Sequence, residues 1–340
     1  MINEIYQLTA PRYIEGTFED LTLTRSRVLI RPAHLSICKA DQRYYQGSRP
    51  KAVLEQKLPM ALIHECIATV EYDPTGTFPA GSSVIPIPNT PVESDPVIAE
   101  NYLRSSKFRS SGFDGFMQDY VLMEPERLVP IDGGVNTNVA AFTELISVCM
   151  HVLTRMDRIA HARRDRIGVW GDGNLGFITS VLLKSFWPDT DVFVFGRNYD
   201  KLSWFSFADG RFQVDDVPKD LTLNHCIECV GGAGAENAIE QMIALIEPEG
   251  TMALTGVSEN NVPINTRMVL EKGLRLFGSS RSGRADFEKT VAFLEQDPNA
   301  HYLQNLVGAE TVIRSIPDIH EAFNADLALR IGKTVLHWEL

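Results

Sequence analysis

The hydrophobic positions follow two different patterns along the chain. In the first 130 residues, short apolar runs are broken by proline and glycine, as in residues 26–38, 60–72 and 81–88. Runs of this length between turn-forming residues predict strands, so this part is expected to form a β-rich lobe. From about residue 140 the apolar positions recur with a helical period, as in residues 140–156.

Strands and helices then alternate. Strands are predicted at residues 166–170, 191–196 and 224–232, and a helix at residues 175–186. This βαβ alternation predicts a Rossmann-type, doubly wound parallel sheet with helices on both faces.

The last sixty residues contain two amphipathic helical segments and the apolar strand 333–338, which are expected to return to the β-rich lobe. The prediction is therefore an α/β protein of two domains. Residues 1–147 and 283–340 would form a β-rich catalytic domain, and residues 148–282 a dinucleotide-binding domain.

The segment "GDGNLG" predicts the cofactor site, because it follows an apolar strand and opens an apolar helix. Gly171 permits the tight turn, Gly173 lets the backbone approach a pyrophosphate, and Gly176 allows close packing of helix and strand. Asn174 and Leu175, at the start of the helix, are expected to contact the cofactor with them.

The end of the next strand indicates which dinucleotide binds. An NAD site needs an acid there for the ribose 2′-hydroxyl. This chain has Gly196 followed by Arg197, with Lys201 one turn later, so NADP(H) is favoured, although Asp200 keeps NAD open. Further cofactor contacts are expected at Val230, Gly231 and Gly256.

Composition narrows the class of partner. The formal charge of -12 argues against nucleic acid or an anionic membrane surface and favours a small molecule. No run approaches the 18 apolar residues of a membrane span, and the start lacks a signal-peptide pattern, so a cytoplasmic location is expected. Five scattered cysteines suit reduced thiols rather than disulfides.

A metal site is indicated by four residues of the first lobe. His64 and Glu65 are neighbours inside a predicted strand, where side chains point to opposite faces unless the strand is irregular. Taken alone, they read as a core histidine beside a surface acid. Together with Cys38 and Glu144, they provide the thiolate, imidazole and carboxylate ligands that catalytic zinc uses.

These segments resemble a known family. The order of six segments is that found in zinc-dependent medium-chain dehydrogenases: "SICKADQRYY", "LIHECIATV", "ELISVCMHV", "GDGNLG", "ECVGG" and "KTVLHW". The chain resembles the polyol branch of this family, which includes sorbitol dehydrogenase. The resemblance implies a GroES-like catalytic domain with one catalytic zinc, held by Cys38, His64, Glu65 and Glu144. Glu144 could bind that zinc directly or through a water.

A closer resemblance is to the NADP-dependent ribitol-5-phosphate dehydrogenases of teichoic acid and capsule synthesis. It is carried by long segments of both lobes, including "ADQRYYQGSR", "NTPVESDPVIAENYL", "RSSGFDGFMQDY" and "LFGSSRSG". It implies reduction of D-ribulose 5-phosphate to D-ribitol 5-phosphate by NADPH, with a cytidylyltransferase activating the product. A homodimer is the expected assembly of this family.

Two departures from the wider family matter. Residues 90–115 contain no cysteine, so the structural zinc of many relatives is not expected. Ala40 stands where many relatives carry a hydroxyl that relays a proton. Glu65, a zinc-bound water or the Tyr44 hydroxyl are the alternative proton routes. Asp41 and Ser147 are expected to support the ligands or substrate hydroxyls.

Cations of the first lobe are candidates for the substrate phosphate, which favours guanidinium forks with hydroxyl donors. Arg43 and Arg109 are the preferred candidates. The complete set of candidate phosphate ligands is Arg43, Arg49, Arg109 and Ser110.

Two other functions stay open: a dehydrogenase for another polyol or sugar phosphate, and a catalytically silent NADP-binding sensor or scaffold.

Overall fold

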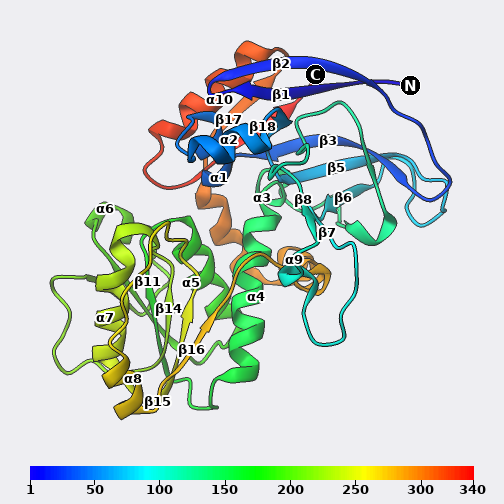
Figure 1. Cartoon of the computed structure of the whole chain (residues 1–340). Coiled ribbons are helices and arrows are strands. Elements are labelled where there is room, and N and C mark those ends of the chain that lie inside the picture. The colour runs from blue at the N-terminus through cyan, green and yellow to red at the C-terminus, as the bar shows by residue number, and fades with distance from the viewer. The chain divides into compact units, whose positions relative to one another are not determined.

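The computed structural model describes all 340 residues, and the chain divides into two compact units (Figure 1). Unit 1 comprises Met1–Ser147, Ser282–Gln296 and Leu306–Leu340, and unit 2 comprises Val148–Arg281 and Asp297–Asn305. The short segment Asp297–Asn305 had been expected in the other domain. No helix combines the length and the apolar character needed to cross a membrane.

Unit 1 is built from β-sheets with helices around them. A three-stranded sheet has the order β2-β1-β4, and a larger sheet has the order β10-β6-β5-β3-β18-β17 with β9 paired to β3. The strands of unit 1 are β1 (Ile2–Ala10), β2 (Tyr13–Asp20), β3 (Val28–Ser36), β4 (Met60–Ala61), β5 (Glu65–Tyr72), β6 (Ser83–Pro86), β7 (Asn89–Thr90), β8 (Lys107–Phe108), β9 (Val121–Met123), β10 (Leu128–Pro130), β17 (Val307–Ile313) and β18 (Lys333–Trp338). Its helices include α1 (Lys39–Tyr45), α2 (Lys51–Lys57), α3 (Thr137–Ala140), α9 (Arg284–Gln296) and α10 (Ile316–Ala328).

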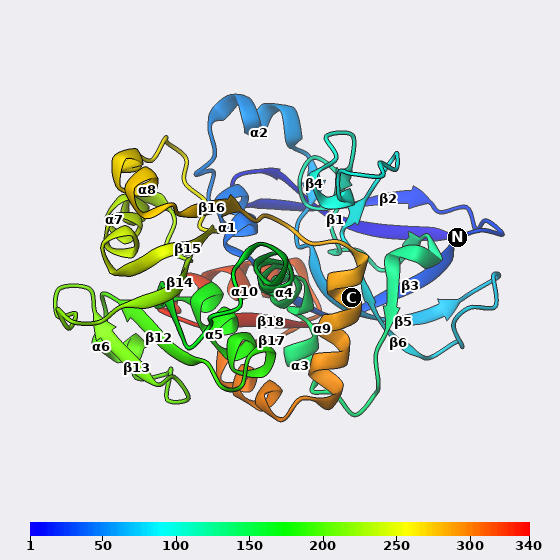
Figure 2. The same cartoon turned by 90° about the horizontal axis from the view of Figure 1, so that it is seen from below.

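The C-terminal segment is part of the first lobe. Strand β18 pairs antiparallel with β3, so that Val335 faces Ser36 and His337 faces His34. Figures 1 and 2 show the blue N-terminal strands and the red C-terminal elements in the same unit. Trp338 packs edge-on against Tyr6, with ring centroids 5.4 Å apart. The two ends of the chain therefore share one hydrophobic core.

Unit 2 is a parallel sheet in the order β13-β12-β11-β14-β15-β16. All its pairings are parallel, and the order reverses direction between β11 and β14, where dinucleotides bind in this fold. Helix α5 packs on one face and α7 and α8 on the other (Figure 1). The predicted doubly wound α/β fold is confirmed. The elements are β11 (Arg166–Trp170), α5 (Asn174–Phe186), β12 (Asp191–Gly196), α6 (Tyr199–Leu202), β13 (Gly210–Gln213), β14 (Leu223–Glu228), α7 (Ala235–Leu245), β15 (Ile246–Leu254), α8 (Thr266–Lys272) and β16 (Arg275–Gly278). Helix α4 (Thr143–Ile159) begins in unit 1 and continues into unit 2.

The single strand predicted across residues 60–72 is wrong, because the chain changes sheets in the middle of it. Strand β4 pairs with β1 in the small sheet, whereas β5 pairs with β3 in the large one. Between them, Ile63 has a φ of 68°. A β-branched residue in this left-handed region is strained and has to be held by its surroundings.

Three contacts hold this connection. The N–H of Ile63 donates to Asp41 Oδ1 at 3.1 Å, the N–H of Phe116 donates to the Ile63 carbonyl at 2.7 Å, and the N–H of Gly115 donates to the Ala61 carbonyl at 2.8 Å. Gly115 lies so close that a Cβ there would meet the carbonyl oxygens of residues 62 and 63 at 2.2 and 2.3 Å. Only glycine fits this approach.

We expect Gly115→Ala to lower the free energy of unfolding by about 2 kcal/mol, because the added methyl group must displace backbone rather than a side chain. The melting temperature, followed by circular dichroism, measures the effect. Gly133→Ala is the control, since a Cβ there meets nothing within 4 Å. Equal melting temperatures for the two variants would show that the close approach is unimportant.

Candidate metal centre and cofactor site

The four predicted metal ligands come together in unit 1. Cys38 immediately precedes α1, His64 lies between β4 and β5, and Glu65 begins β5. The ligand atoms of Cys38, His64 and Glu65 all lie within 4.8 Å of one another. Glu144, in the first turn of α4, places Oε2 3.8 Å from Nε2 of His64. The exposed fractions of His64, Glu65 and Glu144 are 6%, 0% and 7%.

The buried carboxylate of Asp41 organises this cluster. Asp41 Oδ2 accepts the backbone N–H of Cys38 at 3.0 Å, and Oδ1 accepts the Ile63 N–H and the Ser110 hydroxyl, the latter at 2.6 Å. Oδ1 also lies 3.4 Å from Nδ1 of His64. Burial alone would raise the pKa of Asp41, but His64 and these hydrogen bonds hold it below its usual value.

The contact with Asp41 suits a metal-binding histidine. When a carboxylate binds Nδ1–H, the imidazole keeps the tautomer whose Nε2 lone pair is free for a metal. Nε2 of His64 is also the atom that faces Glu144. One thiolate, one imidazole and one or two carboxylates fit a catalytic zinc ion, which keeps a position open for substrate.

A buried lysine, which the sequence analysis missed, faces Glu65. Lys333 Nζ lies 2.8 Å from each oxygen of the Glu65 carboxylate and donates to the Ile37 carbonyl at 2.7 Å. Burial lowers the pKa of Lys333, but Glu65 and the neighbouring Cys38 outweigh it, so the pKa is raised and the lysine stays charged. Its only signal in the sequence is a lysine at the start of an apolar strand.

Glu144 is affected mainly by burial. Burial raises its pKa to about 7, and the carboxylate of Glu65 adds to this rise, while His64 and Lys333 oppose it. Ser147, one turn further along α4, donates to the Glu144 backbone carbonyl at 2.7 Å and contacts Ser282 at the same distance. Ser147 therefore supports the helix that carries Glu144 rather than the ligand atoms.

Arg109 and Ser110, two of the predicted phosphate ligands, contact groups of the protein itself. The Arg109 guanidinium donates to the Asp114 carbonyl at 3.0 Å and to the Met123 sulfur at 3.2 Å, and it lies over the Phe116 ring. Burial lowers its pKa to about 10. Ser110, the next residue, has a left-handed backbone with a φ of 58°, and its hydroxyl donates to Asp41.

The other candidate arginines are carried by α1 and the turn after it. Arg43 is in the last turn of α1, the helix that begins beside Cys38, and is partly exposed. Arg49 is partly exposed and places its guanidinium 4.9 Å from the centre of the Tyr44 ring. Tyr44 itself is 3% exposed. Both arginines thus belong to the segment that positions a metal ligand.

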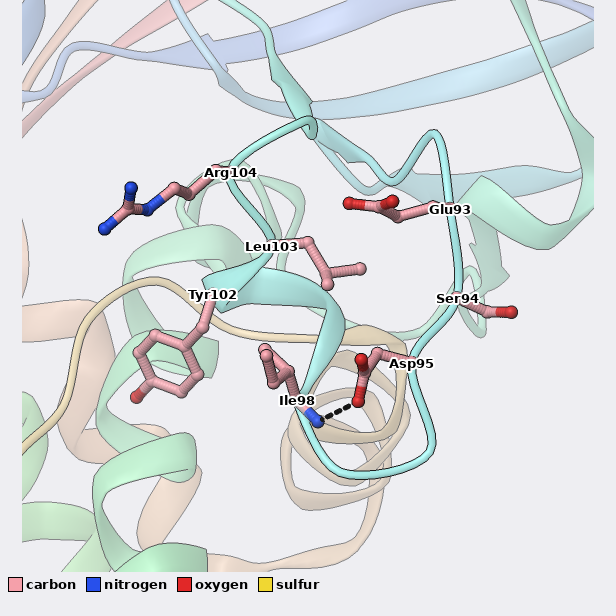
Figure 3. Close-up of a pocket in the computed structure, with 7 residues that line it drawn as sticks. All are labelled: Glu93, Ser94, Asp95, Ile98, Tyr102, Leu103 and Arg104. Atoms are coloured by element: carbon pink, nitrogen blue, oxygen red, sulfur yellow. Dashed lines mark hydrogen bonds between the residues drawn. The ribbon is translucent and has the colours of Figure 1, made fainter.

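A surface pocket lies in the cysteine-free segment 90–115, and it contains none of the predicted metal ligands. Figure 3 shows the Arg104 guanidinium directed away from the carboxylates of Glu93 and Asp95. Two acids make this pocket a poor place for a phosphate. The residues that line it are Glu93, Ser94, Asp95, Ile98, Tyr102, Leu103 and Arg104.

The glycine turn in unit 2 has the shape that a pyrophosphate requires. Gly171 has a φ of 135°, and a Cβ there would meet the Cys229 carbonyl oxygen at 2.9 Å. A Cβ at Gly176 would meet the Gly171 carbonyl at 2.0 Å, whereas Gly173 faces open space. Helix α5 begins at Asn174 and runs for 13 residues, so its N-terminal N–H groups are available to an anion.

Asp172, inside the glycine motif, reaches the end of the next strand, and the sequence analysis did not foresee this. Its Oδ2 accepts the backbone N–H groups of Arg197 and Asn198, both at 2.9 Å. Its Oδ1 lies 3.9 Å from Lys201 Nζ. The Arg197 side chain is exposed. An acid is therefore present at this strand end, although it comes from the preceding turn.

Val230, Gly231 and Gly256, which are expected to contact the cofactor, are hydrogen-bonded to one buried carboxylate. Glu228, at the end of β14, accepts the N–H groups of Val230 and Gly231 through Oε1, each at 2.7 Å, and that of Gly256 through Oε2 at 2.9 Å. It is 1% exposed. Glu228 thus joins the turns after β14 and β15 at the edge of the sheet where a dinucleotide would lie.

Comparisons with known proteins agree with this arrangement. The family model described as "Alcohol dehydrogenase GroES-like domain" matches residues 24–133, and the model described as "Zinc-binding dehydrogenase" matches residues 208–296. The chain is 57% identical to a ribulose-5-phosphate reductase of Bacillus spizizenii, covering 100% of both chains. It is 50% identical to ribulose-5-phosphate reductase 1 of Staphylococcus aureus, covering 99% of both.

Solved structures show the same fold. The crystal structure of S. aureus TarJ in complex with NADPH is 44% identical, with a TM-score of 0.90 and 100% coverage of both chains. L-idonate 5-dehydrogenase of Escherichia coli is 19% identical, with a TM-score of 0.86 over 99% of this chain and 98% of that one. At that identity, the second likeness concerns the fold alone.

We expect Asp41→Asn to weaken zinc binding about 10- to 100-fold, because the amide loses the charge that orients His64 and an acceptor for backbone N–H groups. Competition with a chromophoric chelator measures the affinity. Asp95→Asn is the matched control, since that acid accepts N–H groups only within an exposed loop. Wild-type affinity in Asp41→Asn would contradict the role of Asp41.

Proposed function

The chain belongs to the zinc-binding alcohol dehydrogenase family, and on that premise we propose that it reduces D-ribulose 5-phosphate to D-ribitol 5-phosphate with NADPH. The observation that carries the proposal is the cluster of half-buried Cys38 with buried His64 and Glu65, whose ligand atoms lie within 4.8 Å of one another. The full-length relatives named ribulose-5-phosphate reductase support the choice of substrate.

The protein's part in the reaction would be to hold the zinc ion and to orient the residues that bind it. Zinc, when bound, supplies Lewis-acid polarisation of the substrate carbonyl. Cys38, His64 and Glu65 would hold it, and Asp41 Oδ1, which lies 3.4 Å from Nδ1 of His64, would favour the metal-binding tautomer of the imidazole. Lys333 balances the charge of Glu65, which limits the negative charge at the centre. We propose Glu144 as a fourth carboxylate at the same centre.

The coenzyme is proposed to be NADPH, which supplies the hydride. The turn of Gly171 and Gly173 leaves space for its pyrophosphate at the start of α5. The exposed guanidinium of Arg197 and the ammonium of Lys201 would face the 2′-phosphate, for which a guanidinium is a well-suited partner. The NADPH named with the TarJ structure supports this choice.

For the substrate phosphate we propose Arg43 and Arg49. They lie in α1 and in the turn after it, within eleven residues of Cys38. A phosphate bound there would fix the sugar relative to the metal ligand that opens the same helix. This arrangement would distinguish ribulose 5-phosphate from free ribulose through charge-assisted hydrogen bonds.

The wider setting is proposed from the family. The product would feed a ribitol-5-phosphate cytidylyltransferase that supplies CDP-ribitol for teichoic acid or capsule. A homodimer is the proposed assembly and the cytoplasm the proposed location. One catalytic zinc per chain, without a structural zinc, is also proposed, because segment 90–115 contains no cysteine.

Initial rates with ribulose 5-phosphate and with ribulose, each with NADPH and with NADH, test the proposed reaction. We expect the phosphorylated sugar with NADPH to give the highest kcat/KM, because both phosphates add charge-assisted contacts. A chelator should abolish NADPH oxidation and zinc should restore it. A higher kcat/KM for another polyol phosphate in a substrate panel would contradict the choice of substrate, and full activity without metal would contradict the mechanism.

We expect Arg43→Gln to raise KM for ribulose 5-phosphate about tenfold or more, since a hydrogen bond to a charged group contributes about 1.5–3 kcal/mol. Turnover of ribulose, which has no phosphate, should be unaffected. Arg25→Gln removes an exposed arginine of unit 1 outside α1 and serves as the control. A parallel loss of rate with both sugars would rule out a phosphate contact at Arg43.

A further inference from the structure

Asp172 occupies the position that usually decides between NAD and NADP. In this fold an acid at the end of the second strand binds the ribose 2′-hydroxyl of NAD. Here that strand, β12, ends at Gly196, which has no side chain. A Cβ at Gly196 would meet Asp172 Cβ at 2.6 Å and Oδ2 at 2.8 Å. The carboxylate of Asp172 therefore fills the space that a side chain at Gly196 would need.

This carboxylate is committed to the protein. Oδ2 accepts two consecutive N–H groups, from Arg197 and Asn198, and Oδ1 faces Lys201. The side chain of Asp172 is 19% exposed and that of Lys201 is 25% exposed. Oδ2 therefore uses its acceptor capacity on the turn, and the charge of the carboxylate is partly balanced by the lysine beside Oδ1.

The turn after β12 is also held by two further contacts. Asn198 also caps α6, since its side chain accepts the N–H of Lys201 at 3.2 Å. The Gln213 side chain donates to the Arg197 carbonyl at 3.3 Å. The backbone of Arg197 is thus held on both sides, while its guanidinium is exposed and makes no ion pair.

We propose that Asp172 is a positioning residue for coenzyme choice, which holds the turn at Arg197 so that Arg197 and Lys201 flank the 2′-phosphate. The proposal rests on the proposed use of NADPH. It differs from a direct contact, because Asp172 acts through the backbone of the turn. It also predicts the opposite of simple charge repulsion, in which removal of an acid would strengthen the binding of a phosphate.

Calorimetric titration of the whole protein with 2′,5′-ADP and with 5′-AMP tests this without any turnover, because the two nucleotides differ only in the 2′-phosphate. The ratio of the two Kd values isolates the contribution of the 2′-phosphate, since loss of the fold would weaken the binding of both nucleotides alike. We expect Asp172→Ala to reduce the preference for 2′,5′-ADP about tenfold. Asp172→Asn keeps a carbonyl oxygen as acceptor for the turn and should retain most of the preference.

A double-mutant cycle locates the effect. If Asp172 acts by positioning Arg197, then Arg197→Ala and Asp172→Ala together should cost little more than Arg197→Ala alone. Asp189→Ala is the control for loss of a negative charge, because Asp189 is an exposed acid of unit 2.

The outcomes separate the two proposals. A wild-type protein without preference for 2′,5′-ADP would overturn the proposed coenzyme. A wild-type preference that Asp172→Ala leaves unchanged, or that both Asp172 variants increase, would overturn the role of Asp172 and leave the coenzyme assignment intact. Additive losses in the cycle would also overturn it, because the two residues would then act independently.

Discussion

The candidate metal centre depends on one buried carboxylate, Asp41, that binds backbone from two separate segments. Asp41 accepts the N–H of Cys38 at the start of α1 and the N–H of Ile63 just before His64. A buried carboxylate without such partners would be strongly destabilising, so these contacts tie the two ligand-bearing segments together. The left-handed conformation of Ile63 follows from this constraint, and it allows His64 and Glu65 to be buried together at the junction of two sheets.

Much of the fold could be predicted from local pattern. The alternation after residue 160 and the glycine turn at Gly171 predicted the parallel sheet, because both signals depend on neighbours in sequence. The residue types of the metal centre were also readable, since thiolate, imidazole and carboxylate form a recognisable donor set. The strand break at Ile63 was not readable. It depends on Asp41 and Gly115, which are 22 and 52 residues away in the chain.

Charged residues were the least predictable part of the site. Arg109 was read as a phosphate ligand from its neighbours in sequence, yet its guanidinium packs against Phe116. Asp172 received no role from the glycine motif, yet it supports the turn after β12. In both cases the side-chain direction is set by backbone geometry and by contacts between elements, which a one-dimensional pattern does not contain.

The ion pair of Glu65 and Lys333 has a consequence for how the protein is made. The two residues are 268 positions apart, and β18, which carries the lysine, is the last strand of the chain. During synthesis, Cys38, His64 and Glu65 emerge together long before the cation that balances Glu65. The charge of Glu65 is therefore balanced only once β18 has been made and has paired with β3, after the segments that carry the candidate ligands have been synthesised.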